Sequence, residues 1–317
     1  MTRKVIIDTD PGVDDAMAIF FALCSPELDV IGLTTVFGNV HTDLATTNAL
    51  RLLEIAGRSD IPVAQGADAP LVRPYGGPVP YVHGEDGQGN VPLPPPSSKA
   101  IETQAAVFIV EQIMRAPGEI TLVPLGPLTN IALALRLEPR IAHNVREVVL
   151  MGGNALCPGN ATPAAEANIH NDPEAADLVF GAPWQVTMVG LDVTHRVNMT
   201  RAHLERYAQV DKPMAQHIAR ITPFYRDFFE KTYHCDGIYV HDSSAVAYVI
   251  DPSLFKVERW PVRVDTSSGV SRGKTWPGLG DPLPPPWQGR PLVNVCVEVD
   301  GERLIEMEYE RVCQSSP

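Results

Sequence analysis

The feature that most constrains this chain is a cluster of four aspartates within eight residues: Asp8, Asp10, Asp14 and Asp15. The apolar run Val5–Ile7 before the cluster is typical of a buried strand, and Ala16–Leu23 after it predicts a helix. The cluster therefore occupies a strand-to-helix turn, where open α/β sheets place their ligand sites. Four anions on one turn repel one another unless a cation binds between them, and hard divalent cations prefer carboxylate oxygens. Helix capping by Asp14 and Asp15 accounts for only two of the four acids, so we predict a metal site.

Apolar runs alternate with segments of helical spacing through the first two thirds of the chain. Predicted buried strands are Asp29–Thr35, Ile61–Ala64, Ile120–Pro124, Glu147–Met151 and Gln185–Gly190. Predicted helices between them are Leu44–Ala56, Ile101–Met114, Leu128–Leu137 and Glu174–Phe180. This alternation predicts an α/β protein with an open, mainly parallel (Rossmann-like) sheet and helices on both faces.

The end of the chain predicts a different element. Val293–Val299 and Leu304–Tyr309 flank Asp300-Gly301, which is a strong hairpin signal, so we expect a C-terminal β-hairpin. Two proline-rich stretches, Val91–Pro96 and Asp281–Pro291, are expected to be extended surface loops. Neither a repeat nor a linker divides the sequence, so residues 1–317 are expected to form a single domain.

Composition excludes several classes of partner. The net charge of −13 argues against nucleic acid or an anionic membrane surface. No apolar run is long enough to span a bilayer, and the first residues contain no secretory apolar region. The five cysteines are scattered and never form a CxxC pair, so we expect reduced thiols and a cytoplasmic protein.

Further polar residues follow the predicted strands at the edge where a site would form. They include Asn39, the amide and carboxylate side chains of Asn160, Glu166 and Asn168, and the pair His241-Asp242. Amides and carboxylates of this kind hydrogen-bond sugar hydroxyls. Asn and Gly are also common turn residues, and for any one of these positions alone the turn interpretation is preferred.

Taken together, the clusters resemble the inosine–uridine-preferring nucleoside hydrolases, which cleave ribonucleosides to ribose and free base. The resemblance covers nearly the whole chain, and the first of its motifs is nearly diagnostic. The motifs are the segments at residues 8–16 (DTDPGVDDA), 38–40 (GNV), 126–130 (GPLTN), 151–153 (MGG), 165–168 (AEAN), 172–176 (DPEAA), 191–195 (LDVTH) and 241–242 (HD).

The resemblance implies a calcium site and a ribose site. Asp10, Asp15, Asp242 and the main-chain carbonyl of Leu125 would bind one Ca²⁺; many relatives have threonine where this chain has Leu125. The positions that bind substrate in the family correspond here to Asp14, Asn39, Met151, Asn160, Glu166, Asn168 and Asp242. The implied reaction is hydrolysis of the N-glycosidic bond of ribonucleosides by direct attack of a metal-bound water, with Asp10 as general base. Nearby carboxylates would stabilise the cationic sugar of the transition state.

The groups that receive the departing base are less well defined. His241 matches the position proposed to protonate the base, and His83 matches another histidine of the same pocket. Tyr225 and Phe229 stand at helical spacing and could lie against the base, although core packing explains them equally well. Ala167 replaces the phenylalanine of many relatives and leaves purine or pyrimidine preference open. The family also forms dimers and tetramers, so a homo-oligomer is expected.

The sequence argues against four other classes of protein. The first turn lacks the GxGxxG of dinucleotide-binding enzymes. Gly12 stands where aspartate-nucleophile phosphatases need threonine or valine, and Ile19 occupies the last ligand position of an EF-hand loop. The serious alternative is a non-catalytic nucleoside- or ribose-binding protein, which would be expected to lose Asp10 or His241, yet both are present.

Overall fold

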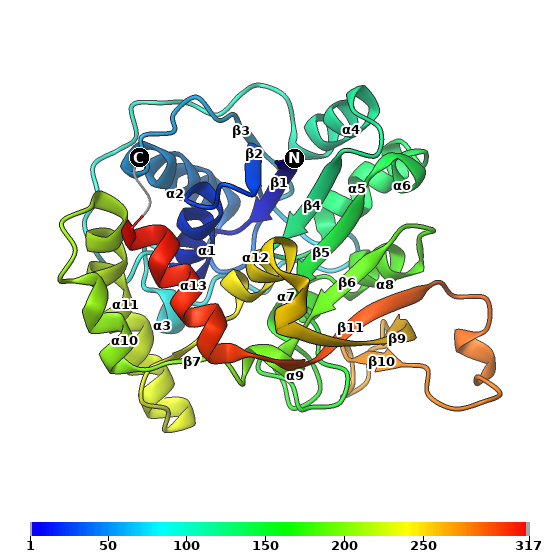
Figure 1. Ribbon diagram of the computed structural model, residues 1–317. Helices are drawn as coiled ribbons and strands as arrows, with labels where there is room; N and C mark the ends of the chain where they lie inside the picture. The colour runs from blue at the N-terminus through cyan, green and yellow to red at the C-terminus, as the bar shows by residue number, and fades with distance from the viewer. Residues whose placement is uncertain (1, 315–317) are drawn as a thin grey trace.

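The computed structural model describes residues 2–314, and its centre is a nine-stranded sheet in the order β10-β9-β11-β6-β5-β4-β1-β2-β3 (Figure 1). Seven strands run parallel to one another: β1 (Arg3–Thr9), β2 (Leu28–Thr35), β3 (Val63–Gln65), β4 (Ile120–Pro124), β5 (Glu147–Met151), β6 (Val186–Val189) and β11 (Leu292–Val299). At one edge, β9 (Phe255–Val264) and β10 (Thr275–Pro277) are antiparallel. The predicted α/β class with a mainly parallel sheet is confirmed.

Strand β1 lies at the point where the order of the sheet reverses. The chain passes from β1 outward through β2 and β3, and then continues on the other side of β1 through β4, β5 and β6. Open α/β sheets form a ligand crevice outside the carboxyl ends of the strands at such a reversal. The aspartate cluster leaves β1 at this crevice, and Leu125 leaves β4 beside it.

Alternate side chains of β1 enter separate hydrophobic cores on the two faces of the sheet. Val5 and Ile7 belong to one core and Ile6 to the other, as the twofold periodicity of a strand requires. The first core is covered by α1 (Val13–Leu23), α2 (Thr42–Ile55), α10 (Arg201–Tyr207), α11 (Pro213–Tyr233), α12 (Asp242–Ile250) and α13 (Gly301–Gln314). The second is covered by α4 (Ala105–Arg115), α5 (Thr129–Leu137), α6 (Ile141–Asn144) and α8 (Pro173–Gly181), which lie together in Figure 1.

Short elements complete the chain. They are α3 (Pro80–His83), α7 (Ala167–Asn171), α9 (Leu191–Thr194) and the 3-10 turns η1 (Pro252–Leu254) and η2 (Pro285–Trp287). Strands β7 (Asn198–Met199) and β8 (Ile238–Tyr239) pair as a small antiparallel sheet. This pairing brings together the two ends of the segment that contains α10 and α11, and it returns the chain to His241 and Asp242.

The predicted C-terminal hairpin is wrong in its second half. Val293–Val299 is a strand, but Leu304–Tyr309 lies within α13. Asp300 starts this helix, because its Oδ1 accepts a hydrogen bond from the Arg303 amide. The apolar positions of the segment have helical rather than alternating spacing: Leu304, Ile305, Val312 and Cys313 are all buried. The Asp-Gly pair is therefore a helix start and not a hairpin turn.

The two proline-rich stretches agree with their predicted loop conformation, since the first has neither helix nor strand and the second contains only η2. Within residues 2–314, no helix combines the length and the apolar character needed to cross a membrane.

Candidate active site

Five aspartates from three elements meet at the carboxyl end of β1. Asp8 and Asp10 come from β1 and the turn after it, Asp14 and Asp15 from the first turn of α1, and Asp242 from the first residue of α12. All five are buried. One carboxylate oxygen from each of Asp14, Asp15 and Asp242 lies within 4.8 Å of the others. The fold therefore brings Asp242, more than 200 residues away in sequence, beside Asp14 and Asp15.

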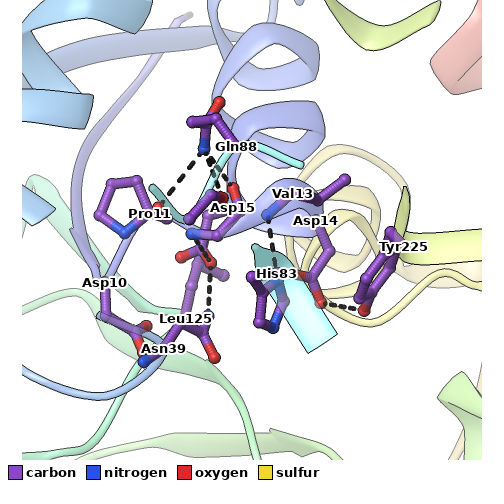
Figure 2. A network of polar contacts seen from close by, with 12 residues as sticks. Asp10, Pro11, Val13, Asp14, Asp15, Asn39, His83, Gln88, Leu125 and Tyr225 are labelled. Atoms are coloured by element: carbon purple, nitrogen blue, oxygen red, sulfur yellow. Dashed lines mark hydrogen bonds and ion pairs between the residues drawn. The ribbon is translucent and has the colours of Figure 1, made fainter. Parts of the chain in front are cut away.

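Hydrogen bonds satisfy these aspartates to different extents. Asp8 Oδ1 accepts bonds from Thr34 Oγ1 and from Asn130 Nδ2 (2.8 Å), whereas its buried Oδ2 has no partner among residues 2–314. Asp15 accepts bonds from Thr9 Oγ1, from the Gly12 amide (2.9 Å) and from Asn39 Nδ2 (3.0 Å). These bonds fix the positions of both side chains, and those of Asp15 can be followed in Figure 2.

Asp10 and Asp14 each retain a carboxylate oxygen that no described group satisfies. Asp10 Oδ2 accepts from the Asn39 amide at 2.6 Å and Asp14 Oδ2 from the Tyr225 hydroxyl at 2.9 Å. Their Oδ1 atoms are buried and have no hydrogen-bond partner among residues 2–314. A buried oxygen without a partner is costly, and a cation would satisfy it.

Burial and mutual repulsion make these carboxylates hard to ionise without a counter-charge. Burial raises the pKa of Asp14 to about 6. Burial, reinforced by the charges of Asp15 and Asp14, holds the pKa of Asp10 well above its usual range. Burial also raises the pKa of Asp242, again with Asp14 and Asp15 as contributors. The donor set and the two unpartnered oxygens therefore fit a divalent cation with oxygen ligands.

A cavity of about 270 Å³ opens directly above the carboxylates. Its lining includes Asp14, Asn39, His83, Leu125, Met151, Asn160, Glu166, Asn168, Tyr225, Phe229, His241 and Asp242. Asp10 and Asp15 are absent from this lining and lie beneath its floor. A larger open cleft of about 650 Å³ lies beside β3 and α4, but it contains none of the predicted site residues.

Amide and carboxylate groups form one wall of the cavity. Glu166 starts α7 and accepts hydrogen bonds from the amides of Gly153 (2.8 Å), Asn168 (2.9 Å) and Ile169 (3.1 Å). Burial nevertheless raises the pKa of Glu166 to about 7. Asn168 Nδ2 donates to the Leu125 carbonyl at 2.6 Å, which places this predicted calcium ligand, the residue after β4, beside the same wall.

Asn160 reaches the same wall from the long loop after β5. Its Oδ1 accepts a hydrogen bond from the Ala167 amide at 2.9 Å, which leaves the amide nitrogen of Asn160 at the cavity. The wall can therefore offer both donors and acceptors to the hydroxyl groups of a sugar.

Aromatic and imidazole rings form the opposite wall. His83 stacks on Tyr225, with ring centroids 5.1 Å apart, and Phe229 contacts Tyr225 edge-on at 4.8 Å. Tyr225 and Phe229 belong to the hydrophobic core and also line the cavity, so the core interpretation is confirmed and their contact with a base stays a prediction. A flat heterocyclic ring fits between such side chains.

Both histidines of this wall are neutral at physiological pH. Burial lowers the pKa of His83 to about 4 and that of His241 to about 3. His83 Nδ1 accepts a hydrogen bond from the Val13 amide at 3.2 Å, so the ring proton of His83 is on Nε2 (Figure 2). His83 Nδ1 lies 3.8 Å from Asp14 Oδ1, but because the His83 ring is neutral the two side chains form no ion pair. His241 Nδ1 lies 2.8 Å from Thr194 Oγ1, which orients the ring.

Comparison with known proteins places this site in a family. The sequence profile described as inosine-uridine preferring nucleoside hydrolase matches residues 5–306. The chain is 46% identical over 319 residues to a probable uridine nucleosidase 2 of Arabidopsis thaliana, covering 99% of this chain and 98% of that protein. The chain belongs to the inosine–uridine-preferring nucleoside hydrolases. It is accordingly a ribonucleoside hydrolase.

Two further matches agree with this family. The inosine-uridine preferring nucleoside hydrolase of Leishmania major is 46% identical over 277 residues, which cover 87% of each chain. A plant nucleoside hydrolase structure superimposes with a TM-score of 0.97 at 43% identity and covers 99% of this chain and 100% of that one.

Within this nucleoside hydrolase, sequence reasoning missed some residues of the site. Thr194, which orients His241, was recognised only as part of a motif. Tyr233 and Phe228 line the cavity beside the predicted aromatic residues. Tyr233 could have been found, because it follows Phe229 by one helical turn on α11.

Proposed function

We propose that this nucleoside hydrolase uses Ca²⁺, held at the aspartate turn, to break the N-glycosidic bond of ribonucleosides by the attack of water on C1′. The observation that carries the proposal is the pair of buried, unpartnered oxygens on Asp10 and Asp14 beneath a cavity with one polar and one aromatic wall. The polar wall suits ribose and the aromatic wall suits a base.

Asp10, Asp15, Asp242 and the carbonyl of Leu125 would hold the ion: Leu125 and Asp242 line the cavity, and Asp10 and Asp15 are buried on the aspartate turn beside Asp14. Asp14 is grouped with Asp15 and Asp242 in the structure, so it is a further candidate ligand besides its role toward the sugar. When bound, Ca²⁺ supplies positive charge that acidifies water and binds sugar hydroxyls.

Asp10 is the proposed general base. Its raised pKa makes the ionised carboxylate a stronger proton acceptor than an exposed aspartate, which favours removal of a proton from the attacking water. Asp14 and Glu166 stand on the sugar side of the cavity, where their negative charge would stabilise the cationic ribose of the transition state. Asn39, Met151, Asn160 and Asn168 would hold the sugar in the orientation that this attack requires.

His241 is the proposed proton donor to the departing base, with His83, Tyr225 and Phe229 as the surrounding contacts. The ring of His241 is neutral before reaction, because it is buried near His195 and His83. Negative charge that develops on the base would raise the pKa of the neighbouring imidazole, so His241 would take up a proton from water, pass it to the base and return to the neutral ring.

The remaining properties follow from the family resemblance. We propose that residues 1–317 form one nucleoside hydrolase domain, that the protein is a homodimer or homotetramer, and that it acts in the cytoplasm; light scattering would test the assembly. Similar proteins carry names that specify uridine or inosine and uridine, so both nucleosides are the first substrates to test.

The decisive experiment is release of reducing sugar from inosine and uridine, with and without exhaustive chelation. We expect turnover that is lost on chelation and restored by Ca²⁺ alone. Full activity in verified metal-free protein would contradict the calcium proposal, and nucleoside binding without ribose release would favour a non-catalytic binding protein.

A second assay tests the ribose site. The 2′-hydroxyl is expected to contact the unpartnered oxygen of Asp14, so its loss would leave buried polar groups unsatisfied. Sites built around a substrate hydroxyl reject its absence by about 10⁴-fold or more. Comparable kcat/KM for uridine and 2′-deoxyuridine would rule out this arrangement.

A further inference from the structure

The buried side chain of Gln88 contacts the back of the aspartate turn, outside the cavity (Figure 2). Its Nε2 donates a hydrogen bond to the Gly12 carbonyl at 2.9 Å and lies 3.4 Å from the Pro11 carbonyl. Its Oε1 lies 2.9 Å from His217 Nε2 on α11. Because the amide nitrogen of Gln88 faces carbonyls, the amide oxygen must accept from His217, whose Nε2 therefore carries a proton.

The segment that carries Gln88 is shaped to approach the turn. Gly87 and Gly89 have φ values of 73° and 66°, in the left-handed region that favours glycine. A Cβ atom on Gly87 would lie 3.1 Å from the Pro11 carbonyl, and one on Gly89 would lie 2.5 Å from the Ile221 carbonyl. The two glycines thus allow Gln88 to fit between the turn and α11.

The same segment also positions His83. The Gly89 amide donates to the His83 carbonyl at 2.8 Å, so Gln88 and His83 belong to one compact unit. His83 Nδ1 accepts from the Val13 amide, one residue after the carbonyl that Gln88 binds. Two consecutive groups of the turn, the Gly12 carbonyl and the Val13 amide, are therefore held by this segment immediately before Asp14 and Asp15.

We propose that Gln88, oriented by His217, is a positioning residue that docks the segment 83–90 on the aspartate turn and fixes His83 relative to Asp14 and Asp15. The expected effect of Gln88 on metal binding rests on the proposed function, whereas its expected effect on the conformation of the turn does not. An apolar side chain at position 88 could fill the same space, but it would leave the His217 N–H without its Gln88 acceptor and the Gly12 carbonyl with only the Ala16 amide as donor.

The first test uses the metal-free protein. Amide hydrogen exchange at Val13 and the ¹⁵N shifts of the His83 ring are measured in Gln88→Leu, His217→Phe and His217→Gln. Gln209→Leu, at an exposed position, is the matched control. We expect Gln88→Leu and His217→Phe to speed Val13 exchange about 10-fold or more and to mix the His83 tautomers. His217→Gln retains a donor and should resemble the wild type.

The second test measures Ca²⁺ affinity by calorimetry in the same variants. Partners that orient metal ligands typically contribute about 10- to 100-fold in affinity, and we expect a loss of that size in Gln88→Leu and His217→Phe only. A lowered melting temperature with unchanged Val13 exchange, His83 shifts and Ca²⁺ affinity would overturn the proposal. If Gln88→Leu does not fold, the contrast between His217→Phe and His217→Gln decides the question. If the wild type binds no Ca²⁺, the proposed function fails, and the exchange data still decide the role of Gln88.

Discussion

At the residue level, hydrogen-bond partners separate the roles of chemically identical aspartates. Both oxygens of Asp15 accept hydrogen bonds, from Thr9, Gly12 and Asn39. By contrast, Asp8, Asp10 and Asp14 each keep one buried oxygen without a partner in the described chain. The sequence shows that the acids are crowded but not which of them are satisfied. That distinction depends on side chains that only the fold brings to the turn.

Asp10→Asn tests the proposed base. The change conserves shape and still allows the Asn39 amide to donate to position 10, but it removes the proton acceptor and one negative charge. We expect kcat for uridine to fall by about 10²–10⁴-fold, the usual scale of acid–base catalysis. The metal-free variant should melt at a higher temperature than the metal-free wild type, because repulsion from Asp15 and Asp14 is relieved. Near-normal kcat with bound Ca²⁺ would exclude Asp10 as the base.

His241→Ala tests the proton donor with two leaving groups. Loss of a general acid should slow uridine cleavage by about 10²–10⁴-fold. A p-nitrophenyl riboside, whose leaving group is stable as an anion, should be cleaved at close to the wild-type rate. Measurement of kcat for both substrates decides the role. Equal losses would mean that His241 only packs beside Asp242 and would direct attention to His83.

At the element level, the sequence predicted strands best where both faces are buried. Ile120–Pro124 and Glu147–Met151 have the predicted bounds, because a short, continuous apolar run has few alternatives once helices alternate with it. The pairing of β9 with β11 was not predicted, since the partners lie on an antiparallel edge with mixed exposure. The C-terminal hairpin was wrongly predicted because tertiary burial is not visible in the local sequence. Asp-Gly can start a turn or a helix, and the burial of Leu304 and Ile305 favours the helix.

Most residues of the candidate site could be predicted from the sequence, but the hydrogen bonds between them could not. The motifs identified every carboxylate at the floor of the cavity, whereas the bonds from Thr194 to His241 and from Tyr225 to Asp14 join elements that are remote in sequence. Helix α11 supplies the bond from Tyr225 to Asp14. It therefore both lines the cavity and stabilises the first turn of α1.

Tyr225→Phe tests the hydrogen bond between Tyr225 of α11 and Asp14 of α1. The Tyr225 hydroxyl donates to Asp14 Oδ2, and its loss would leave both oxygens of a buried carboxylate unsatisfied. The pKa of Asp14 should then rise above its value of about 6, so the acidic limb of the pH–rate profile should move to higher pH. We also expect kcat/KM to fall about 10-fold or more, the usual effect of losing a hydrogen bond to a charged group.

Tyr207→Phe is the matched control for this substitution. Tyr207 is also fully buried, but its hydroxyl has no hydrogen-bond partner within residues 2–314. Its pH–rate profile should coincide with that of the wild type. Coincident profiles for both variants would show that the Tyr225 hydroxyl does not act on Asp14.

At the level of the whole molecule, the fold buries several carboxyl groups in a protein whose net charge is already negative. The net charge is −13, and the described chain buries further carboxyl groups outside the aspartate turn. Glu308 of α13, for example, is fully buried, neither of its oxygens has a hydrogen-bond partner in the described residues, and burial raises its pKa to about 8. Stability without metal should therefore depend on protons held by these groups.

The final prediction concerns stability of the metal-free protein against pH. Burial raises the pKa of Asp8 and Glu166 to about 7 and that of Glu308 to about 8, so the native state holds protons that the unfolded chain has already lost. Stability from these groups is lost as pH rises toward their native pKa values. His83 and His241 have lowered pKa values and destabilise the fold only as pH falls below about 6.5, so they contribute no change above it.

The melting temperature of the metal-free protein should accordingly fall between about pH 6.5 and 8.5. Each group that is still protonated contributes at most about 1.4 kcal/mol per pH unit. Glu308→Gln removes one such group that does not line the cavity, so the melting temperature of this variant should depend less on pH while kcat for uridine is retained. Saturating Ca²⁺ should raise the melting temperature most at the alkaline end, because ionised ligands bind the cation best. A melting temperature that is constant or rises across this range would contradict the idea that protons stabilise these carboxyl groups when metal is absent.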